Sequence, residues 1–552
     1  MKPTHYATIP HEPIIFDTTL REGMQTPGGI GGTLEERVFA ANHIARFADW
    51  VELGMPANDV EYRIIDAIRQ SFQENNREAG IAVLCLNRKA DIDKASEVIG
   101  GYHSSLAHLF IGTSEEHTTT RFDGRWSKED YAENIRTMVA YASAKPFTRV
   151  MFSPEDSYRT FAQSRRNFFA FVDAAIAGYE EGNPARTERL ILNFPDTVGK
   201  SAISEFDLML GRIRRRYGDA IEVSVHCHND SDSSTQQAIE ALAKGKATWL
   251  QTTFGGLGER NGIAPTEGVI AMLHTRGYLN GKRYGTQEVL KDLVPTTHAI
   301  LAALGRSVPA EAIISGSRVN TTTSGIHANL VMKRTDAYHI HGDTYGPGIT
   351  IEFGPTSGST QVIPILAKLG IERQKADIER FTNRLKRKCN EEKTVLDETS
   401  VMYEAAHEFK GIIDPLVVDD YAITTRKGQK SGVELAGSYR GGRFDVRFED
   451  NGPVEALLGA LRGIVGIPIE LTSHELPVIQ KIPEEYLSWK AGEYPRIPHI
   501  LDMHAKLQAT TTITDGERQY TSSARREDSF QAIADSVIQA AVKMMTLKEA
   551  GV

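Results

Sequence analysis

The chain has 552 residues, of which 40% are hydrophobic and 24% charged, and its net charge is −9. This length is too great for one ordinary domain and predicts two or three. The 63 basic and 72 acidic residues are mixed along the chain. Because no long basic patch forms, the sequence argues against a nucleic-acid partner or an anionic membrane surface.

The sequence also bears on where the protein works. No apolar run approaches the ~18 residues that a membrane-spanning helix needs. The N-terminus, residues 1–13, lacks the apolar core of a secretion signal. Cys85, Cys227 and Cys389 are too scattered for a disulfide framework or a CxxC zinc motif. We therefore expect a cytoplasmic protein without a membrane partner.

The first half of the chain alternates short apolar runs with longer amphipathic segments, a pattern typical of βα units and a parallel sheet. The eight strand candidates are Ile14–Leu20, Trp50–Pro56, Ile81–Leu86, Leu106–Gly112, Arg149–Ser153, Leu190–Phe194, Ile221–His228 and Ala247–Phe254. Eight units in this length favour a closed (β/α)₈ TIM barrel over an open doubly wound sheet. No GxGxxG motif follows the first run, which weakens a dinucleotide-binding alternative. We assign residues 1–285 to a catalytic barrel.

Beyond the barrel the pattern becomes helical. Helices are expected at Gln287–Leu304 and from Thr360–Gly370 to Lys410, separated by a stretch rich in Gly, Thr and Pro at His341–Ser359. Long stretches of that composition often serve as lids or linkers. We therefore assign residues 286–420 to helical linker or lid subdomains of an otherwise α/β protein.

The tail contains an approximate repeat. Ser431–Arg447 reads as strand, glycine turn and strand, with a helix from Pro453, and His504–Ala524 reads the same way, with a helix from about Asp528. Each helix has a single apolar stripe, as expected of a helix packed on one side. Residues 421–552 are therefore expected to form an α+β domain with two similar halves. Nothing in it looks catalytic, which favours regulation or dimerisation.

The strongest chemical feature is His226-Cys227-His228, at the end of the seventh strand run. Side chains two apart on a strand point to the same face, so both imidazoles would enter the barrel mouth, where TIM-barrel active sites lie. Two convergent imidazoles are good ligands for a divalent metal. An isolated HxH is more often a hydrogen-bonding pair, but the position here favours the metal.

A carboxylate would complete such a metal site. Glu22 is the candidate, because it follows Arg21 at the end of the first strand run, and only strand eight separates strands one and seven of a closed barrel. The alternative, that Arg21 and Glu22 are a solvated charge pair, is weakened by their place in the dense run FDTTLREGMQTPGG.

Several motifs then occur in a fixed order along nearly the whole chain. They are Phe16–Gly28, ELGMPA at Glu52–Ala57, FSPED at Phe152–Asp156, PDTVG at Pro195–Gly199, HCHND, GLGERNG, SGIH at Ser324–His327 and, in the tail, NGPVEALLGALR. Jointly they resemble the acyl-CoA-condensing TIM-barrel metallolyases, which include 2-isopropylmalate synthases, homocitrate synthases, citramalate synthases and hydroxymethylglutaryl-CoA lyases. The tail motif resembles the regulatory domain of 2-isopropylmalate synthases.

The resemblance implies that Glu22, His226 and His228 hold one divalent ion, with Zn²⁺, Mn²⁺ and Mg²⁺ as candidates. Most members have Asp where this chain has Glu22, whereas homocitrate synthases have Glu. Isopropylmalate synthases often add an Asn ligand after the GER motif, where this chain has Ile263. Three protein ligands would leave open positions for water and a bidentate 2-oxo acid.

The resemblance also implies a metal-dependent acyltransferase that condenses acetyl-CoA with a 2-oxo acid and then hydrolyses the thioester. Arg21 would add positive charge where the alkoxide develops, and His327 and Tyr338 would act as the base that removes a proton from the acetyl methyl group. Many relatives have another His where this chain has Thr322, so any proton relay through it is absent or replaced.

Four further residues are expected to bind the substrate: Gln25, Glu52, Met151 and Thr197. Gln25 and Thr197 could hydrogen-bond its carboxylate.

The identity of the 2-oxo acid depends on Met151. Homocitrate synthases have an Arg there for the second carboxylate of 2-oxoglutarate, and isopropylmalate synthases commonly have Glu. Met suits an aliphatic chain, which favours 2-oxoisovalerate, although Arg159 or Arg121 could serve a second carboxylate instead. Homocitrate synthase and an enzyme for another specialised 2-oxo acid remain the alternatives.

Other activities are weighed against the same motifs. Lyases of this superfamily carry a reactive Cys in the loop after strand eight, and Gly255–Gly262 has none; they also lack the long tail. A biotin-dependent carboxyltransferase would be expected with a biotin-attachment motif, which is absent. A non-catalytic scaffold with a sensor tail is disfavoured because Arg21, Glu22 and the three histidines occur together. The resemblance further implies a homodimer and an amino-acid effector such as leucine.

Overall fold

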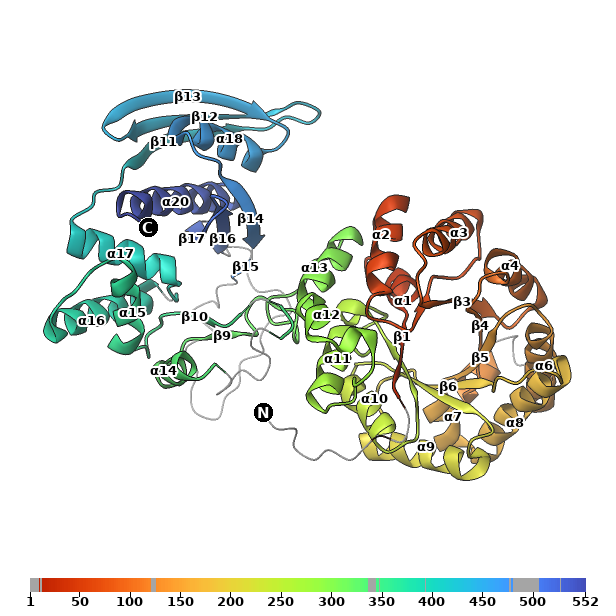
Figure 1. Cartoon of the computed structure of the whole chain (residues 1–552). Coiled ribbons are helices and arrows are strands. Elements are labelled where there is room, and N and C mark those ends of the chain that lie inside the picture. The colour runs from red at the N-terminus through yellow and green to blue at the C-terminus, as the bar shows by residue number, and fades with distance from the viewer. Residues whose placement is uncertain are drawn as a thin grey trace, which may run out of the picture. The chain divides into compact units, whose positions relative to one another are not determined.

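The computed structural model divides the chain into two compact units, drawn in Figure 1. It describes residues 9, 12–120, 126–335, 344–346, 348–392, 394–475, 478–479, 506–526 and 528–552. The first unit comprises residues 1–320 and 341–348, and the second comprises residues 321–340 and 349–552. The chain therefore passes from one unit to the other three times. Among the described residues no helix is long and apolar enough to cross a membrane.

Eight parallel strands of the first unit form a closed barrel in sequence order, which confirms the predicted fold class. The strands are β1 (Ile14–Asp17), β2 (Trp50–Glu52), β3 (Gly80–Leu86), β4 (Ser105–Gly112), β5 (Arg149–Glu155), β6 (Ile191–Asp196), β7 (Glu222–Cys227) and β8 (Trp249–Thr252). Pairing of Ile14 with Trp249 and of Asp17 with Thr252 closes the barrel.

Helices surround the barrel (Figure 1). They are α2 (Leu34–Ile44), α3 (Asp59–Glu74), α4 (Lys89–Ile99), α5 (Glu115–Thr120), α6 (Lys128–Ser143), α7 (Ser157–Gln163), α8 (Arg165–Gly182), α9 (Ile203–Tyr217), α10 (Ser234–Ala243) and α11 (Thr266–Thr275). Alternate strand residues divide between two cores. Ile81 and Val83 pack outward toward the helices, whereas Ala82, Phe16 and Trp249 form the small core inside the barrel.

The first strand run is shorter than predicted. The strand ends at Asp17, and a short helix, α1 (Thr19–Gln25), follows. The Asp17 carboxylate accepts hydrogen bonds from the backbone N–H of Thr19 at 2.9 Å and from the hydroxyl of Thr266 at 2.8 Å. This carboxylate satisfies an otherwise unpaired N–H group at the start of α1. Arg21 and Glu22 are consequently on a helix, and the prediction that the strand runs to Leu20 was wrong.

The barrel unit continues past residue 285. The single helix predicted at Gln287–Leu304 is two helices, α12 (Gln287–Lys291) and α13 (Leu293–Ala303). Tyr345, far along the chain, is buried in the same core, and its backbone carbonyl accepts a hydrogen bond from the N–H of Val294 at 2.9 Å. This contact explains why residues 341–348 group with the barrel. The finer division at residues 285 and 420 stays a prediction.

The second unit begins with short elements and three helices: β9 (Thr321–Thr322), α14 (Gly325–Lys333), β10 (Thr350–Ile351), α15 (Ser359–Lys368), α16 (Lys375–Glu392) and α17 (Glu398–Lys410). Two sheets follow: β11 (Leu416–Thr424), β12 (Ser431–Tyr439) and β13 (Gly442–Asp450) with α18 (Pro453–Val465), then β14 (Glu470–Glu475), β15 (Val478–Ile479), β16 (Lys506–Thr514) and β17 (Gln519–Arg526) with α20 (Ser529–Glu549). The predicted repeat of strand, strand and helix is confirmed. Additional strands precede the repeat in both halves, β11 in the first and β14 and β15 in the second, and the sequence pattern did not reveal them.

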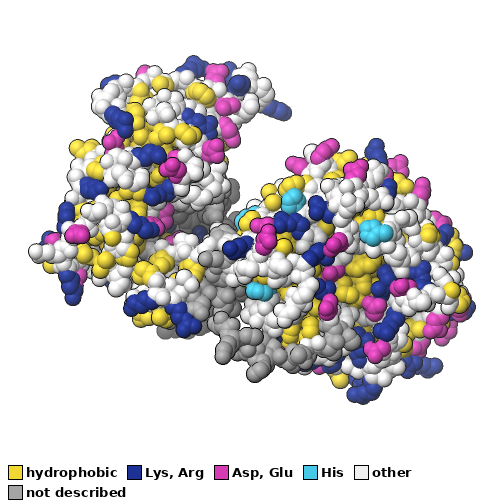
Figure 2. All heavy atoms as spheres, viewed as in Figure 1, with side chains coloured by type: hydrophobic (Ala, Val, Ile, Leu, Met, Phe, Trp, Pro, Cys, Tyr) yellow, Lys and Arg dark blue, Asp and Glu magenta, His cyan; other side chains and the backbone are white. Residues whose placement is uncertain are grey.

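Charges of both signs are interspersed over the surface of each unit on the face drawn in Figure 2. This agrees with the mixed charge pattern of the sequence and with the absence of a long basic run.

Candidate active site

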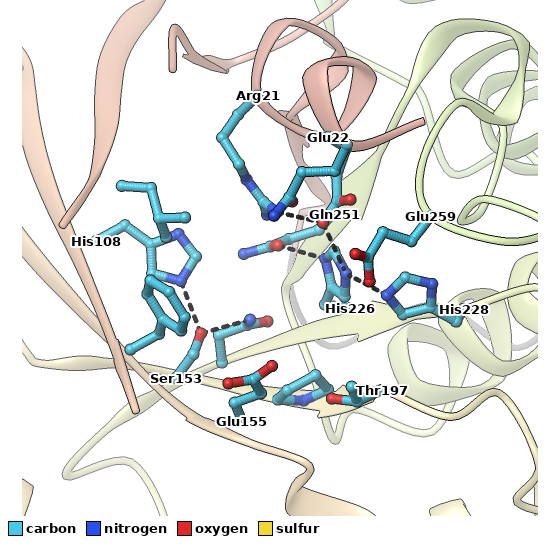
Figure 3. Close-up of a pocket in the computed structure, with 15 residues that line it drawn as sticks. Arg21, Glu22, His108, Ser153, Glu155, Thr197, His226, His228, Gln251 and Glu259 are labelled. Carbon is cyan, nitrogen blue, oxygen red and sulfur yellow. Dashed lines mark hydrogen bonds and ion pairs between the residues drawn. The ribbon is translucent and has the colours of Figure 1, made fainter. Parts of the chain in front are cut away.

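A pocket of about 100 Å³ opens at the carboxyl ends of the barrel strands, where the polar residues of several strands meet (Figure 3). Its lining combines charged and polar side chains with three apolar ones, Leu84, Phe110 and Pro195. The polar and charged members are Arg21, Glu22, Gln25, His108, Ser153, Glu155, Asn193, Thr197, His226, His228, Gln251 and Glu259. Active sites of TIM barrels lie at this face, so the pocket is the candidate active site.

Three potential metal ligands converge in this pocket (Figure 3). His226, on β7, and His228, just after it, face each other with 3.3 Å between their Nε2 atoms. The Glu22 Oε1 atom lies 3.3 Å from the Nε2 atom of His226. The three side chains offer ligand atoms that lie within 4.8 Å of one another, and all three residues are buried. Two imidazoles and a carboxylate are a common ligand set for a divalent cation. The three buried side chains therefore fit the metal that the sequence predicts at this place.

Both imidazoles are in the neutral protonation state, which is the state that binds a metal ion. Burial, with a further contribution from Arg21, lowers the pKa of His226 to about 3, and burial together with His226 lowers the pKa of His228 to about 3. Both rings are therefore neutral near pH 7 and keep a lone pair. Neutral imidazole is the form that ligates metals.

Gln251, on β8, selects which nitrogen of His226 faces the cavity. Its Oε1 atom accepts a hydrogen bond from Nδ1 of His226 at 2.8 Å, which leaves the Nε2 atom toward Glu22 and His228. The Nε2 group of Gln251 in turn donates to the sulfur of Met151 at 3.3 Å. Such a hydrogen bond behind a metal-binding His fixes its tautomer and ring orientation.

Arg21 is held by two carboxylates. Its Nε atom donates to Oε2 of Glu52 at 2.7 Å, and its Nη1 atom contacts Glu22 and donates to Gln25 at 3.2 Å. Although burial opposes it, Arg21 and His108 hold the pKa of Glu52 well below its usual range. Glu52 was predicted to bind substrate, but it lies beneath Arg21 and is not among the residues that line the pocket. Its contacts indicate that it positions Arg21.

A hydrogen-bonded chain beside Arg21 was not foreseen from the sequence. The Glu52 carboxylate accepts from Nδ1 of His108 at 2.6 Å, and Nε2 of His108 lies 2.6 Å from the hydroxyl of Ser153. Asn193 donates to the same hydroxyl at 2.8 Å. These residues come from β2, β4, β5 and β6. The signal was present, since His108 and Ser153 are polar residues inside otherwise apolar strand runs.

The remaining predicted substrate residues separate into two groups. Gln25 and Thr197 line the pocket, and the Thr197 hydroxyl accepts a hydrogen bond from the backbone N–H of Asp156 at 2.9 Å. Met151 is fully buried below Gln251 and does not line the pocket. Arg159, the alternative cation, pairs with Asp156 and Glu116 and is likewise not part of the lining.

The other predicted residues lie elsewhere. His327 is an exposed residue of α14, in the second unit, so the residues that line the pocket do not include it. Thr322 is on β9 of the same unit. Tyr338 and Arg121 lie outside the described residues. Ile263 is fully buried and forms an isolated bridge with His228 through the backbone, without offering a ligand atom.

Comparison with known proteins assigns the chain to a family. A family model described as HMGL-like matches residues 12–300, which is more than half of the chain. The chain belongs to the HMGL-like family. Enzymes of this family depend on a divalent metal ion and use acetyl-CoA.

The likeness to 2-isopropylmalate synthases extends beyond the barrel. The enzyme of Gloeothece citriformis is 30% identical over 488 residues, covering 84% of this chain and 86% of that protein. That of Pyrococcus abyssi is 28% identical over 469 residues, covering 84% of this chain and 91% of that protein. Among solved structures, the HMG-CoA lyase of Bacillus subtilis matches with 18% identity and a TM-score of 0.43, covering 55% of this chain and 98% of that one. The expected 2-isopropylmalate synthase-like acyltransferase is confirmed by the synthases.

Proposed function

We propose that the protein condenses acetyl-CoA with 2-oxoisovalerate and releases CoA by hydrolysis of the thioester. The observation that carries the choice of substrate is the lining of the pocket, in which Arg21 is the single Lys or Arg among the residues that the structure describes. A second buried carboxylate, as in 2-oxoglutarate, would need a second cation. Leu84, Phe110 and Pro195 offer apolar contacts that suit an isopropyl group.

The metal ligands and Arg21 would act on the keto group. Glu22, His226 and His228 would hold a divalent ion, which supplies Lewis-acid polarisation of the keto carbon. Arg21 then places fixed positive charge beside the keto oxygen, where negative charge develops during the reaction. Glu52 holds the guanidinium group in place through its 2.7 Å contact, so no reorganisation is needed as the charge appears.

Proton transfer would involve the second unit. A base removes a proton from the methyl group of acetyl-CoA, the resulting carbanion attacks the keto carbon, and the new alkoxide takes up a proton. Water then cleaves the thioester, giving a carboxylate and CoA thiol. We assign the base to His327 with Tyr338, and the hydrogen bonds to the substrate carboxylate to Gln25 and Thr197. Elemental analysis of the purified protein would distinguish Zn²⁺, Mn²⁺ and Mg²⁺ as the bound ion.

The test of the substrate is the ratio of kcat/KM values for 2-oxoisovalerate and 2-oxoglutarate, measured by release of CoA thiol. We expect the wild type to prefer 2-oxoisovalerate. Leu84→Arg adds a cation to the lining and should shift the ratio toward 2-oxoglutarate by roughly 10- to 100-fold, the worth of one hydrogen bond to a charged group. Met151→Arg is the comparison variant, because it places the same charge below Gln251, outside the lining.

Two outcomes would change the assigned substrate. Wild-type preference for 2-oxoglutarate would make homocitrate synthase the activity. Turnover of neither acid would indicate another 2-oxo acid, which a wider panel would identify. Circular dichroism of each variant separates a shift in specificity from loss of fold.

We further propose that residues 421–552 mediate homodimer formation and bind an amino-acid effector such as leucine. The support is the repeat of strand, strand and helix in both halves, and the extent of the likeness to 2-isopropylmalate synthases. Coupling free energies are typically ~1–3 kcal/mol, so an effector would change substrate affinity by roughly 5- to 150-fold. If neither leucine nor a related amino acid or product shifts the kinetics, regulation is the wrong role.

A further inference from the structure

A cavity of about 380 Å³ lies on the barrel unit, and we call it the basal cavity. Three segments of the chain line it, with Ala45, Arg46, Asn76, Arg77, Glu78, Arg283 and Val289. Arg46 comes shortly before β2, and Glu78 comes shortly before β3. The basal cavity is therefore at the amino ends of these strands, whereas the candidate active site is at the carboxyl ends of the barrel strands. Residues at the amino-terminal face of a TIM barrel do not take part in the reaction, so this is a separate site.

Neutral groups hold two of the three arginine side chains in place. Arg283, at the start of the short helix η3 (Arg283–Gly285), donates through Nη2 to the backbone carbonyl of Ala45 at 2.9 Å. Arg77 donates through Nε to Oδ1 of Asn42 at 2.9 Å, and the amide group of Asn42 donates to the hydroxyl of Ser71 at 2.9 Å. The guanidinium group of Arg77 is therefore oriented through Nε, which leaves its two Nη groups for a ligand.

The carboxylates around the basal cavity do not balance its positive charge. Glu78 is the acidic residue among the described lining residues, against three arginines. Asp49 lies 3.7 Å from Nη1 of Arg283, but it also lies 3.4 Å from Nζ of Lys282 and so serves two cations. Arg77 forms no ion pair with an Asp or Glu in the part of the chain that the structure describes. An anion would supply the charge that is missing here.

We propose that the basal cavity binds a phosphate group, as inorganic phosphate or as a small phosphate ester. The three guanidinium groups come from three segments and can donate to oxygen atoms that point in different directions. A tetrahedral phosphate has such oxygens, whereas one guanidinium group is enough for a planar carboxylate. Ala45 and Val289 are the apolar residues of the lining, so a ligand with a large apolar part finds few contacts. The volume lies at the low end of the range for small-molecule sites.

Arg46 is the arginine for which a ligand would have to compete. Its Nη2 atom lies 2.6 Å from Oδ2 of Asp292, an exposed residue that directly follows α12. Val289 of α12 lines the cavity as well. A phosphate that contacts Arg46, Arg77 and Arg283 would join the ends of α2 and α3 to the segment beyond α11, and it would stabilise the folded state because it binds that state alone.

The experiment is calorimetric titration of the full chain with sodium phosphate as the probe. We expect saturable binding of phosphate and at least roughly ten-fold weaker binding of acetate, which offers one planar carboxylate. Titration with glycerol 3-phosphate separates the two sources of the phosphate group. Tighter binding of glycerol 3-phosphate than of phosphate would identify an ester as the ligand, and weaker binding would identify inorganic phosphate.

Two pairs of variants test the residues with opposite signs. Arg77→Gln should weaken phosphate binding by roughly 3- to 10-fold, and its control is Arg69→Gln, because Arg69 is on α3 but pairs with Asp66 outside the lining. Asp292→Asn should strengthen phosphate binding by roughly two- to five-fold, because Arg46 loses its competing partner. Asp66→Asn is the control for that change and should leave the affinity unaltered.

Hydrogen exchange locates the bound phosphate independently of affinity. Phosphate should protect amides in residues 44–48 and 73–80, and protection confined to residues 18–26 or 226–230 would place it in the candidate active site and overturn the proposal. Absence of saturable binding, equal affinity for acetate and phosphate, or equal affinity in the two arginine variants would also overturn it. Asp292 is exposed, so Asp292→Asn tests the site even if loss of Arg77 harms the fold. Neither readout depends on turnover, which keeps the result separate from any failure of the proposed reaction.

Discussion

The candidate active site and a second cavity, which is lined by residues of α14, β10, α15 and α17 in the second unit, differ in how their charged groups are held. In the barrel, Arg21, Glu22 and Glu52 are almost fully buried and compensate one another directly. In the second cavity, Lys368 and Glu398 form an exposed ion pair beside apolar side chains such as Ile365. Buried charges are costly to leave without partners, whereas exposed ion pairs contribute little to stability. The buried network of the barrel therefore holds its charged groups in fixed positions, whereas the exposed ion pair of the second cavity adds little to the stability of the fold.

The largest expected effect in the barrel follows removal of a metal ligand. His226→Ala should lower kcat/KM by roughly a thousand-fold or more, because Lewis-acid polarisation contributes several kcal/mol to the barrier. The fold should survive, which circular dichroism checks. His43→Ala, on α2 outside the pocket, is the control. Full activity in His226→Ala or in metal-stripped enzyme would refute the metal assignment.

The next largest effect is expected at Glu267, a buried carboxyl group with no Lys or Arg partner among the described residues. Glu267 accepts hydrogen bonds from the N–H of Gly255 at 3.1 Å and from the Ser315 hydroxyl at 3.2 Å, and burial raises its pKa to about 7. The folded state therefore binds the proton more tightly than the unfolded state. This group contributes stability below about pH 4.5, and the contribution is lost as pH rises to about 7.

Glu267→Gln imitates the protonated carboxyl and should remove that pH dependence. We expect the variant to be more stable than the wild type at pH 8, by up to about 3 kcal/mol, and equally stable at pH 4. Denaturant unfolding at both pH values measures the difference. Glu379→Gln, on the exposed side of α16, should change neither value. A variant less stable at pH 8 would show that the charged form is the one the fold prefers.

The smallest expected effect follows loss of the hydrogen bond between Gln251 and the metal ligand His226. Gln251→Leu should weaken divalent-metal affinity by roughly 10- to 100-fold, because His226 loses the partner that fixes its tautomer. Competition with a chelator measures the affinity. Gln237→Leu is the comparison, since Gln237 is equally buried but bonds Ser201 instead. Equal metal affinity in the two variants would contradict the role of Gln251.

The sequence predicted the barrel because short apolar runs that alternate with amphipathic segments, and the number of these units, are local signals. It also indicated that Glu22, His226 and His228 would converge, since HxH spacing and barrel closure set their direction. It did not predict that Asp17 ends the strand, because that depends on its contact with Thr266, which is distant along the chain. The Glu52, His108 and Ser153 chain was missed for a related reason: its hydrogen bonds join strands whose register only the closed barrel fixes.

The threefold passage of the chain between its two units has a further consequence. Residues 321–340 belong to the second unit, yet residues 341–348 return to the barrel unit, where Tyr345 is buried. A single protease cut near residue 320 would break the covalent link, and residues 1–320 would then be held to the rest of the chain through non-covalent packing of residues 341–348. Neither half is a contiguous stretch of sequence, so gene truncation cannot isolate one intact. A recombination event that replaced only the tail, and left the barrel unit intact, would therefore need its crossover point downstream of residue 348.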